Sequence, residues 1–367
     1  MLSTFGRLPN VSDGIRCMVL RGGSSKGAYF LADDLPVDVA ARDSLLRRIM
    51  GSPDPRQIDG IGGAHPLTSK VAVVAPADDP AADVDYLFLQ VGVEDGVVTD
   101  RQNCGNLLAG VGPFALERGL LPEPPDGEVS VRIRMLNTDS MATARFAVRG
   151  GSPVYEGSTA ISGVPGTAAA IHLAFSDLAG GSTGALLPTG NTVDTVDGIA
   201  CTLIDNGMPV VVLRAEALGV TGYESCAELE QNADLGAALE NLRLKSGELM
   251  GLGDVRETTV PKLTLVAPPR DGGDLSTRTF IPHRCHDAIG VLGAVSVATA
   301  ARLDGTPARA CSSAADDGMV RIEHPTGFFD AFVDVTVGAD GRLEVEHAGI
   351  VRTARKLMDG TVFPRAE

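Results

Sequence analysis

The chain has 367 residues, of which 44% are apolar, and a formal net charge of −16. This length fits two domains of ordinary size, each with enough apolar residues for a buried core. The acidic balance, without any run of Lys and Arg, excludes a nucleic-acid partner, and no apolar stretch is long enough to cross a membrane.

Glycine and cysteine indicate more about the fold and the cellular location. The 44 glycines and the absence of tryptophan favour many short strands joined by tight turns. The six cysteines are scattered and form no CxxC pair, which in a chain of this size indicates reduced thiols and a cytoplasmic location.

The first predicted strands flank a glycine-rich turn in GIRCMVLRGGSSKGAYFLADDLP, residues 14–36. The turn is only superficially similar to a phosphate-binding loop, because it joins two strands and lacks the GxxxxGK[ST] spacing. Its backbone amides and the hydroxyls of Ser24 and Ser25 could still bind a carboxylate.

Lys70 begins the next predicted strand, in TSKVAVV, directly after Ser69 and a second glycine-rich turn. A lysine at a strand start usually extends its amine into water. A partly desolvated lysine, however, has a depressed pKa and can act as a base near neutral pH. Lys70 is therefore a candidate general base.

A helix rich in small residues follows in QNCGNLLAGVGPFALERGL, residues 102–120. It is apolar on all sides and should be buried. Its first turn offers free amides and the positive end of the helix dipole, which favour a bound carboxylate and a reactive thiol. Cys104, Gly105 and Asn106 stand at this place, although a cysteine there is most often only a small buried hydrophobe.

The second half of the chain repeats the first. Four blocks recur in the same order, beginning at residues 198, 259, 283 and 320, and the second block sets Lys262 against Lys70. The repeat predicts two like-folded domains, 1–185 and 186–367, with the last strand able to return to the first domain. Each would be an α+β unit, a curved, mainly antiparallel sheet around one central helix, with the ligand in a cleft between the domains.

The repeat also predicts that the second central helix starts at Arg284-Cys285-His286-Asp287. Cys285 or His286 would then face the ligand, depending on the alignment of the two helices. Lys262 follows a proline where Lys70 follows Ser69, so it is the weaker candidate base. His283 and His286 flank Cys285, but a metal is not expected, because no further His or Cys stands at ligand spacing from these three residues. The other cysteines, Cys17, Cys201, Cys226 and Cys311, are interpreted as buried small hydrophobes.

Long motifs then identify a family. RGGSSKGAYFLADDLP, IDGIGGAHPLTSKVAVV, NCGNLLAGVGPFALE, GDVRETTVPKLTLVAPP and TFIPHRCHDAIGVLGAVSVATA resemble the 2-methylaconitate isomerase, or PrpF-type, family over essentially the whole chain. The resemblance implies a diaminopimelate-epimerase-like fold and a 1,3-allylic proton shift on a small di- or tricarboxylate, without a cofactor. It implies Lys70 and Cys104 as the catalytic residues and Arg278 as a carboxylate ligand.

Three alternatives stay open: another substrate within the family, namely 2-methylaconitate, a two-thiol epimerase or racemase that uses Cys285, and a protein that binds a carboxylate without converting it. The expected partner is a small carboxylate and neither nucleic acid nor a membrane. A homodimer is one option that the sequence does not decide.

Overall fold

The computed structural model describes residues 14–101, 103–176, 178–315, 317–337 and 343–366. The chain forms two compact units, the first made of residues 1–173 and 352–367 and the second of residues 174–351. The division thus falls between residues 173 and 174, earlier than the boundary at 185/186 indicated by the repeat. The C-terminal residues belong to the first unit because strand β17 (Leu343–Val362) runs from the second unit into it.

The sheet of the first unit closes into a ring of eight strands. The order around the ring is β17–β1–β2–β3–β4–β6–β7–β9, and β9 pairs again with β17. Pairing is parallel at β2–β3 and β4–β6 and antiparallel at β17–β1, β1–β2, β3–β4 and β6–β7. The strands are β1 (Ile15–Gly22), β2 (Ser25–Leu31), β3 (Lys70–Pro76), β4 (Val84–Val91), β6 (Gly127–Met135), β7 (Ser140–Arg149) and β9 (Ala170–Phe175), with short β5 (Val98–Thr99) and β8 (Ser152–Pro153) at the margins.

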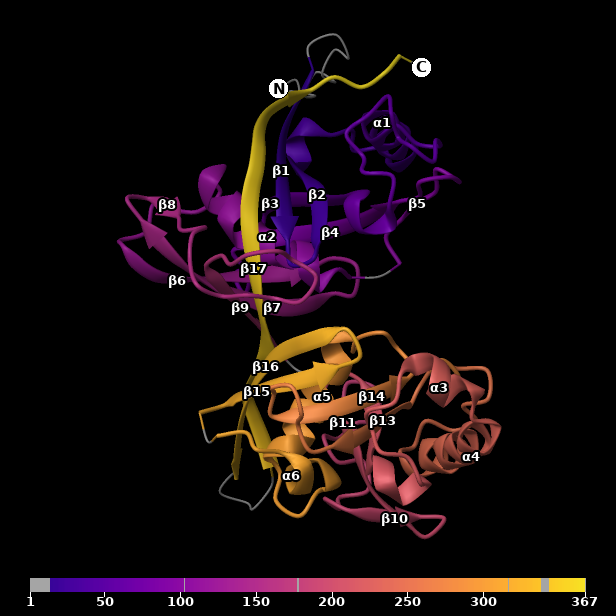
Figure 1. Cartoon of the computed structure of the whole chain (residues 1–367). Coiled ribbons are helices and arrows are strands. Elements are labelled where there is room, and N and C mark those ends of the chain that lie inside the picture. The colour runs from indigo at the N-terminus through magenta and orange to yellow at the C-terminus, as the bar shows by residue number, and fades with distance from the viewer. Residues whose placement is uncertain (1–13, 102, 177, 316, 338–342, 367) are drawn as a thin grey trace. The chain divides into compact units, whose positions relative to one another are not determined.

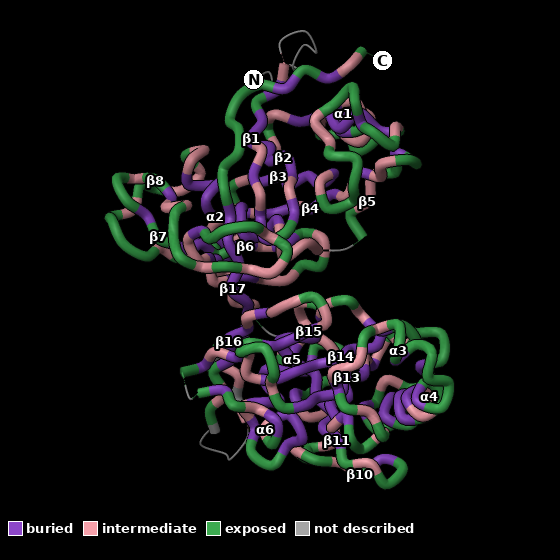
Figure 2. The backbone as a smooth tube through the Cα atoms, in the orientation of Figure 1, coloured by how far each residue is buried: buried purple, intermediate pink, exposed green. Residues whose placement is uncertain are grey.

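Helix α2 (Gly105–Glu117) lies against the inner face of this ring (Figure 1), in contact with β1, β2, β3, β4 and β7. Every residue from 107 to 116 is buried, as expected for a helix that is apolar on all sides. Figure 2 shows the same helix as a continuous buried segment.

A second layer covers the outer face of β3 and β4. Helix α1 (Val39–Met50) begins at Asp38, whose carboxylate accepts the Ala41 amide, and ends at Gly51 in the left-handed conformation. Its apolar side packs on the sheet through Leu45, Leu46, Ile49, Met50, Val71, Val73, Leu89 and Val91. Short 3-10 turns lie at η2 (Ala32–Asp34) and η3 (Pro66–Thr68).

The second unit repeats this plan. Its strands pair in the order β10–β11–β12–β13–β14–β15–β16–β17, parallel at β12–β13 and β14–β15. They are β10 (Asp194–Val196), β11 (Ile199–Asp205), β12 (Pro209–Arg214), β13 (Lys262–Ala267), β14 (Leu275–Phe280), β15 (Met319–His324) and β16 (Gly327–Val337). The helices are η4 (Ala215–Leu218), α3 (Cys226–Gln231), α4 (Ala233–Leu249), α5 (Val291–Arg302) and α6 (Pro307–Cys311).

The two units match at their parallel pairs. Gly27 on β2 stands opposite Lys70 on β3, and Val210 on β12 stands opposite Lys262 on β13. In the second unit α5 takes the place of α2, in contact with β11, β12, β15 and β16. The α+β, diaminopimelate-epimerase-like fold expected from the sequence is therefore confirmed.

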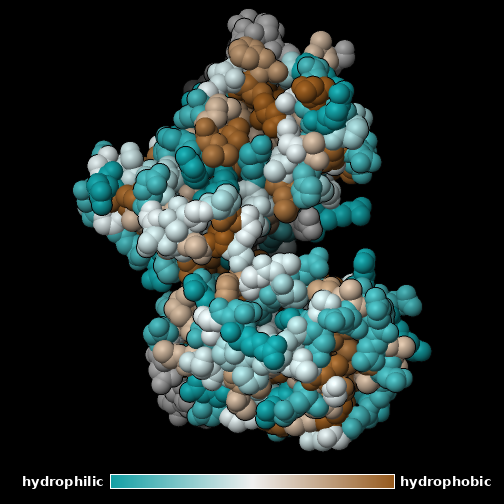
Figure 3. All heavy atoms as spheres, viewed as in Figure 1, coloured by the Kyte–Doolittle hydropathy of each residue, from teal (hydrophilic) through white to brown (hydrophobic). Residues whose placement is uncertain are grey.

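The surface agrees with the acidic composition. Figure 3 shows a largely hydrophilic face, broken by separate apolar patches. Among the described residues, every helix is too short or too polar to span a membrane.

Candidate active site

Lys70 is the first residue of β3, and its amine is held on the inner face of the sheet. Val71 and Val73 face the outer cluster under α1, so Lys70 faces α2, because alternate residues of a strand point to opposite sides. The side chain is only 7% exposed. Its Nζ lies 4.9 Å from the centre of the Phe88 ring and donates to Gln90 Oε1 at 2.8 Å.

Gln90 is fixed in turn by the backbone before β3. Its Nε2 donates to the carbonyl oxygens of Ser69, at 3.0 Å, and Pro66, at 3.1 Å. These two bonds leave Oε1 turned toward the lysine. The ring and the amide oxygen both interact favourably with an ammonium group, so this pair would stabilise Lys70 after it has taken up a proton.

Ser69 supports the same segment from the other side. It is fully buried, and its hydroxyl donates to Gln57 Oε1 at 2.7 Å. Its side chain is therefore committed to an internal bond, which places it in support of the Lys70 strand rather than at a carboxylate.

Cys104 is the N-cap of α2, and no side chain caps the helix there. Its carbonyl oxygen accepts from the Tyr86 hydroxyl at 3.4 Å. Burial, and then the Cys104 thiol, hold the pKa of both Tyr86 and Tyr29 well above the ordinary value. The thiol therefore lies beside two neutral phenols and next to the free amides of Gly105 and Asn106. Gln102, in the same predicted segment, lies outside the described residues.

Strand β4 brings Lys70 and Cys104 to one face. Phe88 touches the lysine amine and Tyr86 reaches the Cys104 carbonyl. The two aromatic residues are next but one on the strand, so they point the same way and are spaced about 7 Å apart. The predicted amine and thiol thus share the inner side of β4, at the start of α2.

The glycine-rich turn between β1 and β2 packs on this helix start. A Cβ on Gly22 or Gly23 would overlap the backbone or side chain of Asn106. The close approach lets Asn106 Nδ2 donate to Ser24 Oγ, at 3.2 Å, and to Ser25 Oγ, at 3.3 Å. The predicted residues Ser24, Ser25, Gly105 and Asn106 are therefore neighbours.

Arg352 is a site residue that sequence reasoning missed. It comes from β17, and its Nε donates to Asn106 Oδ1 at 3.3 Å. The Asn106 amide thus links Arg352, which is 8% exposed, to the two serine hydroxyls. The only signal was the expectation that the last strand returns to the first domain, since Arg352 and Asn106 lie far apart in sequence.

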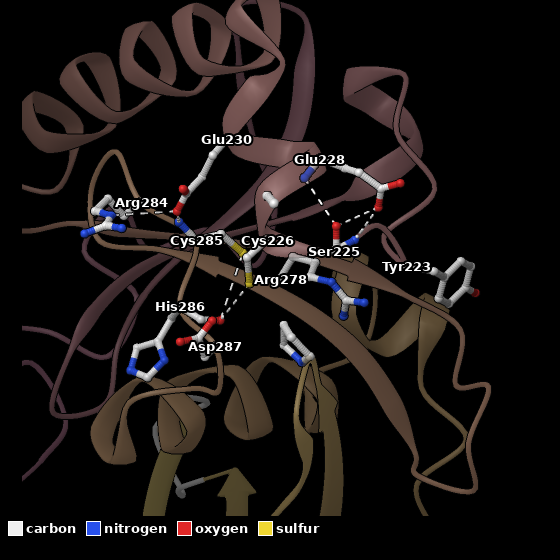
Figure 4. Close-up of a pocket in the computed structure, with 12 residues that line it drawn as sticks. Tyr223, Ser225, Cys226, Glu228, Glu230, Arg278, Arg284, Cys285, His286 and Asp287 are labelled. Atoms are coloured by element: carbon white, nitrogen blue, oxygen red, sulfur yellow. Dashed lines mark hydrogen bonds and ion pairs between the residues drawn. The ribbon is translucent and has the colours of Figure 1, made fainter.

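The second unit has its own cavity, of about 1000 Å³ (Figure 4), lined by Tyr223, Ser225, Cys226, Ala227, Glu228, Glu230, Arg278, Arg284, Cys285, His286, Asp287 and Pro325. Arg278 on β14 donates through Nε to the Glu224 carbonyl at 2.6 Å and through Nη1 to the Thr277 carbonyl at 2.8 Å. Among the described residues, its Nη2 has no such partner, so it can donate to a carboxylate in the cavity.

The prediction that the second helix begins at the Cys285 cluster is wrong. Helix α5 begins at Val291 with Gly290 as its N-cap. The preceding segment is tied elsewhere: the Cys285 amide donates to Glu230 Oε1 at 3.0 Å, the His286 amide to the Thr279 carbonyl at 2.8 Å, and the Ala288 amide to His286 Nδ1 at 2.9 Å. Cys285 therefore lacks the helix-start environment that Cys104 has.

Cys285 and His286 nevertheless line the cavity with Arg278. Burial is the main reason why the pKa of Cys285 is raised and that of His286 lowered. Lys262, the counterpart of Lys70, has a pKa lowered by burial and by Arg243. Within the described residues, no three His, Cys, Asp or Glu side chains form a group suited to a metal ion.

Comparison with known proteins gives a consistent result. The family model described as "PrpF protein" matches residues 13–365. The chain is 57% identical to "(4E)-oxalomesaconate Delta-isomerase" of Novosphingobium sp. (strain KA1), over 96% of this chain and 98% of the relative. It is 53% identical to "4-oxalomesaconate tautomerase" of Pseudomonas putida, over 95% of each chain.

A solved structure agrees over the whole fold. The crystal structure of methylitaconate-delta-isomerase superposes with a TM-score of 0.85 at 36% identity and covers 95% of each chain. The family resemblance and the isomerase class expected from the sequence are confirmed by these relatives.

Proposed function

The chain belongs to the PrpF protein family, and on that premise we propose that it is an isomerase that converts 4-oxalomesaconate by a 1,3-allylic proton shift. Two relatives with more than half of their residues identical to this chain carry that substrate in their names. We also propose, from what the family resemblance implies, that this acid comes from the breakdown of gallate and protocatechuate. The observation that carries the chemistry is the Lys70 amine held on the same face of β4 as Cys104.

The substrate has an acidic carbon, because the anion left by a proton between a carbonyl and a double bond is delocalised. Neutral Lys70 takes this proton, the double bond moves by one position, and the ammonium returns a proton to the carbon two atoms away. The shift leaves the composition of the acid unchanged. Gln90 Oε1 and the Phe88 ring stabilise the transient ammonium, an interaction that is stronger after proton transfer than before it.

The start of α2 holds the negative charge that develops on the substrate. The amides of Gly105 and Asn106 have no helical carbonyl to bind, and the helix dipole adds to their effect. Cys104 acts there as a hydrogen-bond donor or second acid, close to the phenols of Tyr29 and Tyr86.

Carboxylates of the substrate bind to the hydroxyls of Ser24 and Ser25 and to Arg352, which Asn106 joins into one cluster. In the second unit, Arg278, Cys285 and His286 remain our predicted binding residues. All of these groups belong to the protein, so the route needs no cofactor. We place the enzyme in the cytoplasm, where its six free thiols stay reduced.

Three other functions are less well supported. An isomerase of 2-methylaconitate would use the same groups, because the two acids differ in their substituents. A two-thiol epimerase needs a second activated thiol, and Cys285 has a raised pKa and no helix start. A protein that only binds a carboxylate does not need a general base, so it does not account for the buried Lys70 amine beside Gln90.

The test compares turnover of the two acids. Ultraviolet absorbance measures the rates, and proton NMR in deuterated water measures the exchange of substrate protons. We expect a kcat/KM for 4-oxalomesaconate at least about a hundredfold above that for 2-methylaconitate, which corresponds to about 3 kcal/mol. Preference for 2-methylaconitate would overturn the substrate, and binding without exchange of any substrate proton would overturn the enzymatic function.

A further inference from the structure

Two thiols of the second unit stand together at the wall of the cavity. Cys226 is the first residue of α3, and Cys285 follows β14. The Sγ of Cys226 lies 3.6 Å from the carbonyl oxygen of His286, and the Sγ of Cys285 lies 4.0 Å from the same oxygen. Figure 4 shows the two sulfur atoms next to one another.

The backbone at both thiols is held in place. Ser225 closes a capping box with Glu228 in front of Cys226, and the Cys285 amide is bound to Glu230 of the same helix α3. Cys226 also packs against the apolar cluster that contains Cys285. A bond between the sulfurs would therefore order little additional chain.

The thiols differ in access and in chemistry. Cys226 is partly exposed, whereas Cys285 is 8% exposed. Burial, and then a hydrogen bond to Cys226, raise the pKa of Cys285. Cys226 is thus the thiol that meets a solute in the cavity first, and Cys285 is positioned to react with whatever forms on it.

The remaining cysteines lack such a partner among the described residues. Cys17, Cys201 and Cys311 are buried on β1, β11 and α6. Burial raises the pKa of Cys17 and of Cys201 to about 12. Cys104 belongs to the first unit, and no other thiol contacts it among the described residues of that unit.

We propose that Cys226 and Cys285 form an oxidisable dithiol, a modification site whose co-reactant is a hydroperoxide. The Cys226 thiol gives up its proton, the thiolate attacks one oxygen of hydrogen peroxide, and the O–O bond breaks. The leaving hydroxide takes up that proton, so a sulfenic acid and water result. The Cys285 sulfur then displaces the hydroxyl group, which leaves with the Cys285 proton as a second water, and the S–S bond forms. Two thiols are oxidised by two electrons and one peroxide is reduced to two waters.

The test uses the full chain, treated with a small excess of hydrogen peroxide, alkylated and digested with trypsin. We expect the free thiols to fall from six to four. We also expect peptide 215–243, which holds Cys226, to be joined to peptide 285–302, which holds Cys285, with the loss of two hydrogens.

Two variants make the result specific. Cys226→Ser should give no joined peptide, and its number of free thiols should not fall by two. The matched control Cys311→Ser should still give the joined peptide. An unchanged thiol count in the native chain, a link between any other cysteines, or a sulfinic acid on Cys226 without the link would each overturn the proposal. These readouts need no turnover, so they are independent of the proposed substrate.

Discussion

Lys70 Nζ donates to Gln90 Oε1 at 2.8 Å, and Gln90 is itself anchored to the backbone that precedes the lysine. The amine is therefore not a mobile side chain at a strand end, because its position is set from a neighbouring strand. This relationship makes Gln90 a positioning residue. Its substitution should change the rate while Lys70, the base, stays in place.

Gln90→Met keeps the length of the side chain and removes the acceptor. We expect kcat to fall about 10- to 100-fold, because the amine loses its fixed position. Gln90→Glu instead places a negative charge beside the amine and raises its pKa. Because the base must be neutral, the acid limb of the pH–rate profile should move to higher pH, by one unit for each 1.4 kcal/mol or so of added interaction. A Gln90→Glu profile identical to that of the native enzyme would contradict this role.

Cys104→Ser separates activity from stability. Serine is a better N-cap than cysteine, and α2 has no side-chain cap. The free energy of unfolding should therefore stay the same or rise by up to about 1 kcal/mol. Turnover should nevertheless fall at least about tenfold, because a hydroxyl is a weaker acid than a thiol. Urea unfolding and initial rates measure the two effects, and full activity in this variant would reduce Cys104 to a structural role.

Gly22→Ala tests the close approach of the turn to α2. The added methyl group would overlap the Asn106 carbonyl, so we expect a loss of about 1–3 kcal/mol in the free energy of unfolding. Gly236→Ala is the matched control, since no heavy atom lies within 4 Å of its Cβ. Within α4 that change should be neutral or stabilising by up to about 1 kcal/mol. Equal effects of the two substitutions would contradict the predicted packing.

His324 should make stability depend on pH. Its side chain is buried, and burial lowers its pKa in the folded state. The unfolded chain then binds the proton more tightly, so this contribution is complete above the unfolded pKa near 6.5 and is lost as the pH falls through it. His286 adds to the same trend. Urea unfolding between pH 7.5 and 5.5 should show a smaller slope in His324→Asn, while the exposed control His347→Asn keeps the native slope.

The repeat predicts much of this fold because each block keeps its own hydrophobic pattern. The buried helix at Cys104 and the strand at Lys70 follow from apolar runs and from turn residues that act locally. The start of the second central helix does not follow from such local patterns, because residues 281–288 form hydrogen bonds with β14, with α3 and with each other. Two partners of this segment, Glu230 on α3 and Thr326 after β15, are distant in sequence, and these bonds together with the local ones outweigh the similarity to the first helix.

The candidate site could likewise be predicted only where its residues stand in local motifs. Lys70 and Cys104 stand in long motifs, whereas Gln90 and Arg352 act through partners that only the folded chain supplies. Helix α1 was also missed, although Asp38 as an N-cap and Gly51 after the last turn are local signals for its ends. Cys226 was interpreted as a buried hydrophobe, because nothing in its own segment points to Cys285.

The central claim is that Lys70 transfers the proton. Native protein, Lys70→Met and the matched control Lys262→Met should be incubated with 4-oxalomesaconate in deuterated water and followed by NMR. We expect native protein and the control to move the double bond and exchange the allylic proton, and Lys70→Met to be slower by a factor of about a thousand while keeping its urea midpoint. Near-native exchange in a folded Lys70→Met protein would contradict the account.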